Sequence, residues 1–355
     1  MKRGFSTIYA LVQTLLLATG LALAFAFAWK DGTTDLVLCL VGMATAFIFA
    51  PVLHELGHVF AAWSVKMEYV LVKFFCFKIV RNQGKKHIRL VSPFAADETQ
   101  VIPKTGGNMQ KRAAKYTLGG LIFSGIVLSI LVIAAVLCTC LSNTQYVLWG
   151  AVPYTAYLFM LNVAPVEYVG GKTDALVYLG IKNAAPAEKT MLAAMEIQGN
   201  LYAGKSFSEL DENLYYDLPQ LAEDEPLYAV ILDLRYRYHL EKGEIERAAD
   251  CLNRLALSQE YLPYEQVMQV AVELTYMHAI RGDITNAEES AKLCKASLQE
   301  DTLRAKRALL AYAIATKKED AVAILKEQIT AMIEKEYPLG LAKSEKILLA
   351  KLLDE

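Results

Sequence analysis

The sequence predicts an all-α polytopic membrane protein with about four transmembrane helices and a small β-hairpin at the membrane surface, followed by a soluble α-helical repeat domain. Hydrophobic residues make up 55% of the 355 residues. They gather in the first half, whereas Glu, Lys, Ala and Leu dominate after about residue 185. So uneven a distribution indicates two environments. We therefore expect a membrane-embedded domain over 1–180 and a cytosolic helical domain over 185–355.

Several segments of the first half are apolar enough to cross a bilayer, which takes roughly 20 residues in a helix. The first follows Lys2 and Arg3, so a cleaved signal peptide is an alternative. Its apolar stretch is long for a signal peptide, which favours a retained helix. The expected spans are 8–29, 36–63, 118–141 and 146–164.

The loop between the second and third segments orients the chain. It carries eleven Lys and Arg residues against three acidic ones, while the other two loops carry almost no basic charge. By the positive-inside rule, the N-terminus, this basic loop and the C-terminal domain should be cytoplasmic. The pattern is typical of a bacterial cell membrane. A net charge of −2 gives no indication of nucleic-acid binding.

The basic loop begins with a segment rich in β-branched and aromatic residues. These residues flank the turn-prone letters NQGKK within 69–91. We expect a β-hairpin there, lying at the cytoplasmic surface of the lipid bilayer.

The second half contains a weak internal repeat. The letters EKGEIERA, IRGDITNA and ATKKEDA end at Ala248, Ala287 and Ala321, at intervals of 39 and 34 residues. Such spacing is typical of paired-helix repeats, and the array resembles tetratricopeptide repeats. His239 and His278 occupy the same phase, which indicates packing rather than ligand binding. The domain could bind a cytosolic regulator or the tail of a substrate, mediate self-association, or serve only as a passive stabilising domain.

The second apolar segment contains the letters HELGH, with His54, Glu55 and His58. Histidines at positions i and i+4 share a helix face, so both imidazoles can reach one metal ion. A glutamate beside them can take a proton from metal-activated water, as in metalloproteases. Because a charged group at the bilayer centre costs roughly 3 kcal/mol, a role as simple polar contacts between helices is a poor alternative.

A catalytic zinc ion normally takes three protein ligands and keeps one position open. The sequence after the fourth segment offers two carboxylates, Glu167 and Asp174, beside Pro165 and a pair of glycines. These helix-breaking residues would let the chain fold back toward the second segment. Within the hydrocarbon core of a bilayer, irregular backbone is tolerated only where protein or a water-filled cavity surrounds it.

The combined pattern resembles the site-2 protease family, the intramembrane zinc metalloproteases of peptidase family M50. The resemblance rests on a membrane-embedded HELGH followed, two apolar segments later, by Asn162-x-x-Pro165 and an aspartate, and it covers roughly 36–180. Ala175 stands where the family usually has glycine. The resemblance favours Asp174 over Glu167, and it implies β structure at the membrane surface.

What the resemblance implies about function is regulated intramembrane proteolysis: hydrolysis of a peptide bond in or near the transmembrane segment of a membrane protein. The alternatives are an inactive membrane scaffold that acts through its helical repeats, and an iron oxygenase with two histidines and one carboxylate. The implied roles are zinc binding by His54, His58 and Asp174, catalysis by Glu55, and substrate binding by Asn162.

Overall fold

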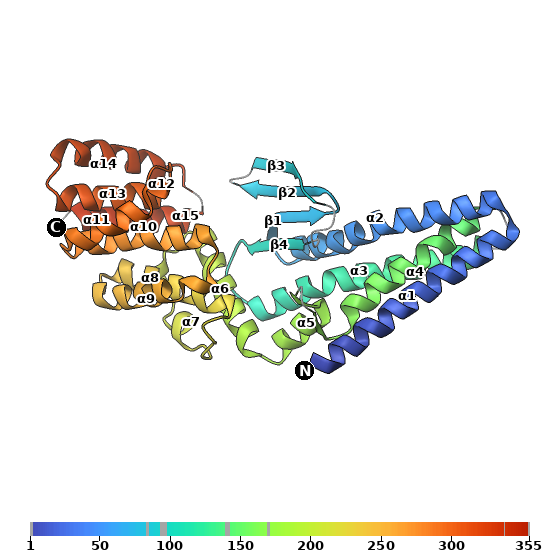
Figure 1. Cartoon of the computed structure of the whole chain (residues 1–355). Helices are drawn as coiled ribbons and strands as arrows, with labels where there is room; N and C mark the ends of the chain where they lie inside the picture. Colours follow the sequence, from blue (N-terminus) through green and yellow to red (C-terminus); the bar gives the residue numbers. More distant parts are fainter. Residues whose placement is uncertain are drawn as a thin grey trace. The chain divides into compact units, whose positions relative to one another are not determined.

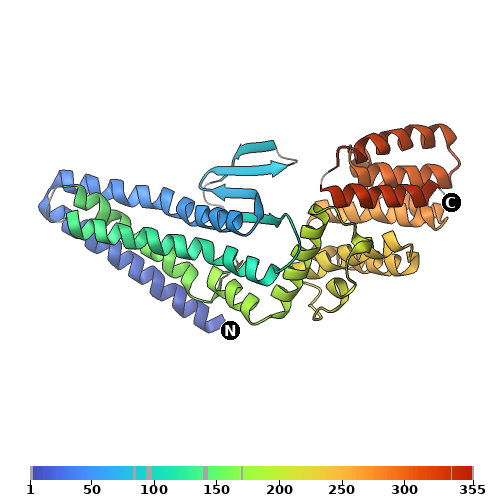
Figure 2. The same ribbon diagram turned by 180° about the vertical axis from the view of Figure 1, so that it is seen from behind.

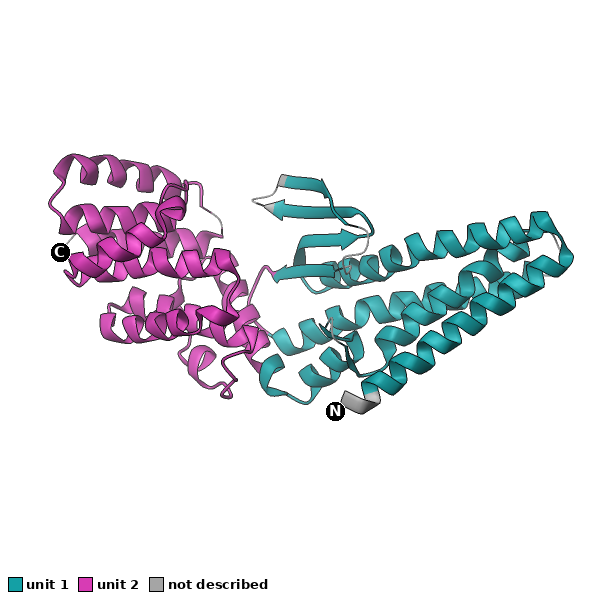
Figure 3. Ribbon diagram, viewed as in Figure 1, with its two compact units in different colours: residues 1–102, 108–188 teal, residues 103–107, 189–355 magenta. Residues whose placement is uncertain are grey.

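The computed structural model describes residues 3–82, 85–92, 98–138, 143–168, 171–336 and 338–353. Contacts divide the chain into two units, which are coloured separately in Figure 3. The first comprises residues 1–102 and 108–188. The second comprises residues 103–107 and 189–355.

Long helices that lie side by side dominate the first unit, as both views of the ribbon show (Figures 1 and 2). Many of their apolar side chains are exposed, among them Leu11 and Leu15 at 66% and 67%. Large apolar residues facing outward along whole helices are typical of lipid-facing surfaces. The helices are α1 (Arg3–Asp31), α2 (Thr33–Ser64), α3 (Met109–Cys138) and α4 (Thr144–Val163).

Within the described residues, three helices are long and apolar enough to cross a membrane. They are α1, α2 and α3, which indicates a membrane-associated protein. The predicted fourth span coincides with α4, a helix of 20 residues that does not reach the same hydropathy. Residues 139–141, the predicted end of the third span, lie outside the described residues.

Small residues let α2 and α4 approach closely. A Cβ added at Gly42 would lie 2.0 Å from the carbonyl oxygen of Val147, and one at Gly150 would lie 2.2 Å from that of Cys39. Close backbone packing of this kind is typical of helix pairs in membranes, where lipid supplies no hydrophobic force between helices.

The basic loop forms a small sheet rather than the single hairpin predicted over 69–91. Strand β1 (Met67–Phe74) pairs antiparallel with β2 (Phe77–Asn82), which pairs antiparallel with β3 (Lys85–Leu90). A further strand, β4 (Glu98–Pro103), completes the order β3-β2-β1-β4 among the described residues. The letters NQGKK do separate two strands, although residues 83 and 84 are not described. An additional turn at Phe75, which has a φ of 49°, separates β1 from β2.

After α4 the chain folds back in a short turn. Strands β5 (Glu167–Tyr168) and β6 (Gly171–Lys172) form a two-residue pairing, and helix α5 (Asp174–Lys182) follows. Gly170, one of the paired glycines, lies outside the described residues. This turn brings the start of α5 back beside α3, which α5 contacts.

The second unit is built from antiparallel helix pairs, drawn from yellow to red in Figure 1. The helix α6 (Pro186–Tyr202) precedes them. Short elements join the longer helices: η1 (Phe207–Glu209), α7 (Asn213–Tyr216), η2 (Gln259–Tyr261) and α12 (Lys295–Leu298). The pairs are α8 (Pro226–Lys242) with α9 (Ile245–Leu257), α10 (Tyr264–Ile280) with α11 (Ile284–Leu293), and α13 (Leu303–Ala315) with α14 (Glu319–Ile333), before α15 (Leu339–Leu353).

The turns inside the pairs explain the internal repeat. Gly243 and Gly282 have φ values of 78° and 73°, a conformation that glycine adopts without strain. In the third pair Lys317 adopts a φ of 55°, so a lysine takes the left-handed conformation that glycine has in the other two turns. Ala248 and Ala287 are fully buried where the paired helices touch. Ala321 is only half-buried, so the third pair departs from the repeat.

The two histidines of the repeat make equivalent contacts. His239 Nδ1 lies 2.7 Å from Glu244 Oε2, and His278 Nδ1 lies 3.7 Å from Asp283 Oδ2. Each histidine is therefore paired with the carboxylate that follows its helix. These contacts fit the prediction that both are structural.

A buried charge network crosses the core of the second unit. Arg307 donates to both oxygens of Glu273, at 2.9 and 2.7 Å, and also contacts Glu345. The hydroxyl of Tyr236 donates to Glu273 at 2.8 Å. Removing one partner of such a pair leaves a buried charge without compensation, which is strongly destabilising.

We therefore expect Glu273→Gln to lower the free energy of unfolding of the second unit by about 3 kcal/mol. Cys251 and Cys294 are buried in this unit, at 6% and 1% exposure, so they report on its unfolding. Maleimide labelling of these thiols is followed across a urea titration by peptide mass spectrometry. The urea concentration at half-maximal labelling should be lower in Glu273→Gln than in the wild-type protein. Glu288→Gln breaks an exposed pair with Lys292 and should cost less than about 1 kcal/mol. Equal shifts in the two variants would contradict the prediction.

Candidate metal centre

Three polar side chains are buried within five residues in the second half of α2. His54, Glu55 and His58 are each only 6–7% exposed, in a helix otherwise made almost entirely of apolar residues. The spacing of four residues puts both imidazoles on one face of α2, as the sequence predicts. The ring centroids are 5.0 Å apart and nearly perpendicular.

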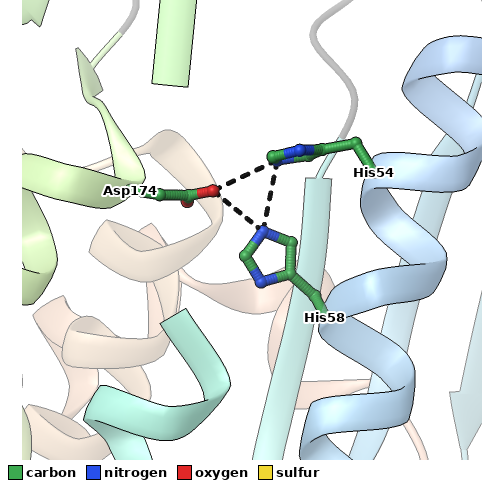
Figure 4. A group of neighbouring side chains, drawn as sticks. All are labelled: His54, His58 and Asp174. Carbon is green, nitrogen blue, oxygen red and sulfur yellow. Dashed lines mark hydrogen bonds and ion pairs between the residues drawn. The ribbon is translucent and has the colours of Figure 1, made fainter. Parts of the chain in front are cut away.

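Asp174 meets the two histidines from the opposite side of the site (Figure 4). Its Oδ2 lies 3.2 Å from Nε2 of His54 and 3.2 Å from Nε2 of His58. The two Nε2 atoms are 3.3 Å apart. Two ligand atoms from α2 and one from Asp174, far along the chain, thus form a nearly equilateral triangle.

Asp174 is held there by the residue that precedes it. Thr173 caps α5, and its hydroxyl accepts from the backbone N–H of Leu176 and donates to the carbonyl of Ala164 at 2.7 Å. Burial alone would raise the pKa of the Asp174 carboxyl, but contacts with His54 and His58 lower it to about 2. Asp174 is therefore an anion at neutral pH.

The outer nitrogen of each imidazole also has a partner. His54 Nδ1 lies 2.9 Å from the hydroxyl of Ser124, and His58 Nδ1 lies 3.1 Å from the carbonyl oxygen of Tyr116. A carbonyl can only accept, so Nδ1 of His58 donates. When His58 is neutral, its lone pair is then on Nε2 and available to a metal ion, which is the arrangement that metal-binding histidines use.

Both partners lie on α3, which comes close because glycine occupies the contact. A Cβ added at Gly120 would lie 2.4 Å from Nε2 of His58 and 2.7 Å from Cε1 of His54. A Cβ at Gly57 would lie 2.6 Å from the carbonyl oxygen of Gly119. The imidazoles therefore occupy space that only glycine leaves open.

Glu55 points to a different partner. The hydroxyl of Thr99 in strand β4 donates to Oε2 of Glu55. The carbonyl of the same threonine accepts from the hydroxyl of Tyr116 at 2.5 Å. Through Thr99, strand β4 is thus hydrogen-bonded both to Glu55 and to Tyr116. The backbone carbonyl of Tyr116 in turn accepts from Nδ1 of His58.

A cavity of about 880 Å³ opens beside the triangle, lined by residues from all four long helices, β4 and the α4–α5 turn. His54, Glu55, His58 and Asp174 all line it. Asn162 lines it too, although its amide donates to the carbonyl of Leu158 in its own helix at 3.3 Å. The cavity is large enough to take an extended peptide segment or several water molecules.

The sequence offers two carboxylates as the third ligand, Asp174 and Glu167, and the structure brings only one of them to the histidines. Among the described residues, Asp174 forms with His54 and His58 the one group of three or more His, Cys, Asp or Glu residues whose ligand atoms all lie within 4.8 Å of one another. Glu167 is exposed in β5 and is not part of that group.

Sequence reasoning missed the residues that surround these groups: Ser124, Tyr116, Thr99 and Gly120. Ser124 and Gly120 offered a signal, because a hydroxyl and a small residue inside an apolar span often mark a helix contact. Thr99 offered none, because the loop before α3 has no periodic pattern.

The donor set fits a divalent metal ion. In a tetrahedral zinc site with bonds of about 2.0–2.1 Å, ligand atoms lie roughly 3.3–3.4 Å apart. The three separations here are 3.2, 3.2 and 3.3 Å. Two neutral imidazoles and one carboxylate could therefore hold such an ion.

No family model matches this chain, and neither a curated protein nor a solved structure was found to be similar to it.

Proposed function

We propose that this chain is an intramembrane zinc metalloprotease that resembles the site-2 protease family. The observation that carries the proposal is the triangle of His54, His58 and Asp174, with Glu55 lining the same cavity among helices of membrane-crossing length. The resemblance of HELGH and Asn162-x-x-Pro165 to that family supports it. In this proposal α4 is a fourth span, and the N-terminus and the second unit face the cytoplasm of a bacterial cell.

A zinc ion held by this triangle would polarise the scissile carbonyl and lower the pKa of a bound water to about 7. Glu55 accepts the proton of the attacking water and passes it to the leaving amine. Thr99 occupies one oxygen of Glu55 and leaves the other for this transfer. Asn162 lines the cavity and steadies the substrate backbone or the oxyanion, as the family resemblance implies.

The position of the site sets the substrate class. Because α2 carries the site and is apolar enough to cross a membrane, the peptide bond cleaved there would belong to a membrane-spanning segment or to one that sinks into the bilayer. Such a helix must unwind before its carbonyl can be attacked, and in lipid the freed backbone groups need protein partners. An exposed strand edge offers these partners by strand addition.

The hairpin expected over 69–91 does not offer a free edge around 69–81, because β1 and β2 are interior strands of the described sheet. The edge strands of the described sheet are β3 and β4, and β4 carries Thr99 beside Glu55. We therefore assign the pairing to β4.

Replacing Glu55 by Gln should abolish cleavage while zinc content and fold are kept, because the amide cannot accept the proton. Comparative membrane proteomics of cells with the wild-type chain and cells with Glu55→Gln should reveal membrane-spanning fragments that accumulate uncut only in the variant. Zinc is measured on the purified variant by mass spectrometry.

Full turnover by Glu55→Gln would end this mechanism. An identical set of membrane proteins in the two strains, with no zinc in the wild-type protein, would favour the inactive scaffold. Iron in place of zinc would favour the oxygenase.

Asp174→Ala should lower zinc affinity at least about tenfold, since it removes the anionic member of the triangle. The matched control is Glu167→Ala, which changes the exposed carboxylate of β5 and should keep wild-type affinity. Competition with a chelator of known affinity measures both. Loss of zinc in the Glu167 variant instead would show that the ligand is misassigned.

Strand addition makes a separate prediction about β4. Gln100→Pro should block cleavage with zinc content intact, because proline removes a backbone donor and distorts the strand. Ile88→Pro makes the same change in β3, the opposite edge of the described sheet, and should leave cleavage in place. The spans that accumulate in Glu55→Gln should accumulate in the first variant and not in the second. Unimpaired cleavage by Gln100→Pro would refute pairing at β4.

A further inference from the structure

The second unit contains a groove of about 230 Å³ between α8, α9 and α10, with Arg304 of α13 at one side. Its lining is mainly apolar. Val230 is exposed there, at 42%, although it belongs to a helix whose other apolar residues are mostly buried. The apolar lining residues include Val230, Leu234, Leu255, Leu262 and Val270.

The charged groups that line the groove are already neutralised inside the unit. Asp233 Oδ2 lies 2.8 Å from Nε of Arg237. Glu273 is bound by Arg307, and Nε of Arg304 lies 3.5 Å from Oε1 of the same carboxylate. The groove therefore offers an apolar floor with polar amide groups beside it, and no free cation lines it within the described residues.

The surroundings of the groove are acidic. The sequence has no lysine or arginine in 206–234 or in 255–280, the two stretches that supply most of its lining. A hydrogen bond to Glu260 and the nearby carboxylates of Asp224 and Glu223 raise the pKa of the Tyr261 hydroxyl, which places these acids around Tyr261. Tyr261 is the chain neighbour of Leu262 on the groove wall.

These acidic groups are available for a partner. Glu223, Asp224, Glu225 and Glu260 are exposed, and none forms an ion pair with a described residue. Tyr261 and Tyr264 are 51% and 76% exposed. Exposed tyrosine rings attract Lys and Arg side chains through cation–π contacts.

We propose that this groove binds the Lys- and Arg-rich cytosolic flank of the membrane-protein substrate, and so recruits the substrate to the protease. The inference rests on the proposed function and on its cytoplasmic orientation. Charge complementarity selects the occupant: cytoplasmic flanks of membrane spans carry an excess of Lys and Arg. Apolar side chains of the flank fill the groove while its cations meet the surrounding acids.

Other occupants fit less well. An anionic membrane surface or an acidic peptide would be repelled by the carboxylates around Tyr261. A second copy would bring the same acidic groups against one another. A basic, partly apolar segment fits best, because its apolar side chains can pack on the apolar lining and its cations can contact the surrounding carboxylates.

The test measures binding of a short fluorescent peptide that alternates leucine with lysine. It uses full-length Glu55→Gln protein in a neutral detergent, so that no cleavage interferes. The peptide should bind, and a peptide with glutamate in place of lysine should not. Glu223→Lys, Asp224→Lys and Glu225→Lys together should weaken binding about tenfold or more, and added salt should weaken it in the parent protein.

The matched control reverses three exposed acids elsewhere in the unit: Glu289→Lys, Glu300→Lys and Glu327→Lys. It changes net charge equally and should alter affinity less than about threefold. A third variant, Val230→Asn, should also weaken binding, since it places an uncharged polar group on the apolar lining. Circular dichroism checks that each variant keeps its helix content.

Equal binding of the lysine and glutamate peptides, or equal losses in the two triple variants, would overturn the proposal. Its failure is distinguishable from failure of the proposed function. If cleavage depends on Glu55 while the peptide does not bind, recruitment by the groove is wrong and the protease stands. If the peptide binds as expected while Glu55→Gln accumulates no uncut span, the groove binds basic segments but the protease is wrong.

Discussion

The structure depends on satisfying polar groups in a helix that is apolar enough to lie in lipid. His54, Glu55 and His58 can be buried in α2 only because each finds a partner within the protein. The two outer ring nitrogens face α3, Glu55 faces β4, and the two inner ring nitrogens face Asp174. The close approach of α3 at Gly120, the short strand β4 and the turn before α5 all serve this one requirement.

The sequence predicts the part of the site that a single helix determines. A spacing of four residues places His54 and His58 on one face whatever the surrounding fold, and the helix-breaking residues near Pro165 were enough to expect the chain to return. It could not predict Thr99, which lies 44 residues from Glu55 in a loop without periodicity. A contact of that kind depends on strand order, and the order β3-β2-β1-β4 places the last strand beside the first. The prediction of a single hairpin over 69–91 therefore misses the contact between Thr99 and Glu55.

The second unit shows the same division between local and long-range information. Glycines with positive φ at 243 and 282 mark turns that local pattern alone predicts. The buried pair of Glu273 and Arg307 is different, because charged residues in a helical sequence ordinarily indicate a solvent-exposed face. Only the packing of α10 against α13 shows that these charges neutralise one another in the core. The third helix pair, with Lys317 at its turn, departs from the repeat for a local reason that its sequence already shows.

Strand β4 combines two roles that need not have been joined. The side chain of Thr99 binds the glutamate proposed as the general base, and its carbonyl is fixed by Tyr116, whose own carbonyl receives His58. If a substrate pairs with this strand, the scissile segment, Glu55 and the histidine pair are positioned by one short run of backbone. Such an arrangement would restrict catalysis to peptides that are already unwound and extended. An intact transmembrane helix offers no strand to pair, so it would pass the site uncut until part of it leaves the helical state. Selectivity for unstable helices would then follow from hydrogen bonding alone, without any pocket for a particular side chain.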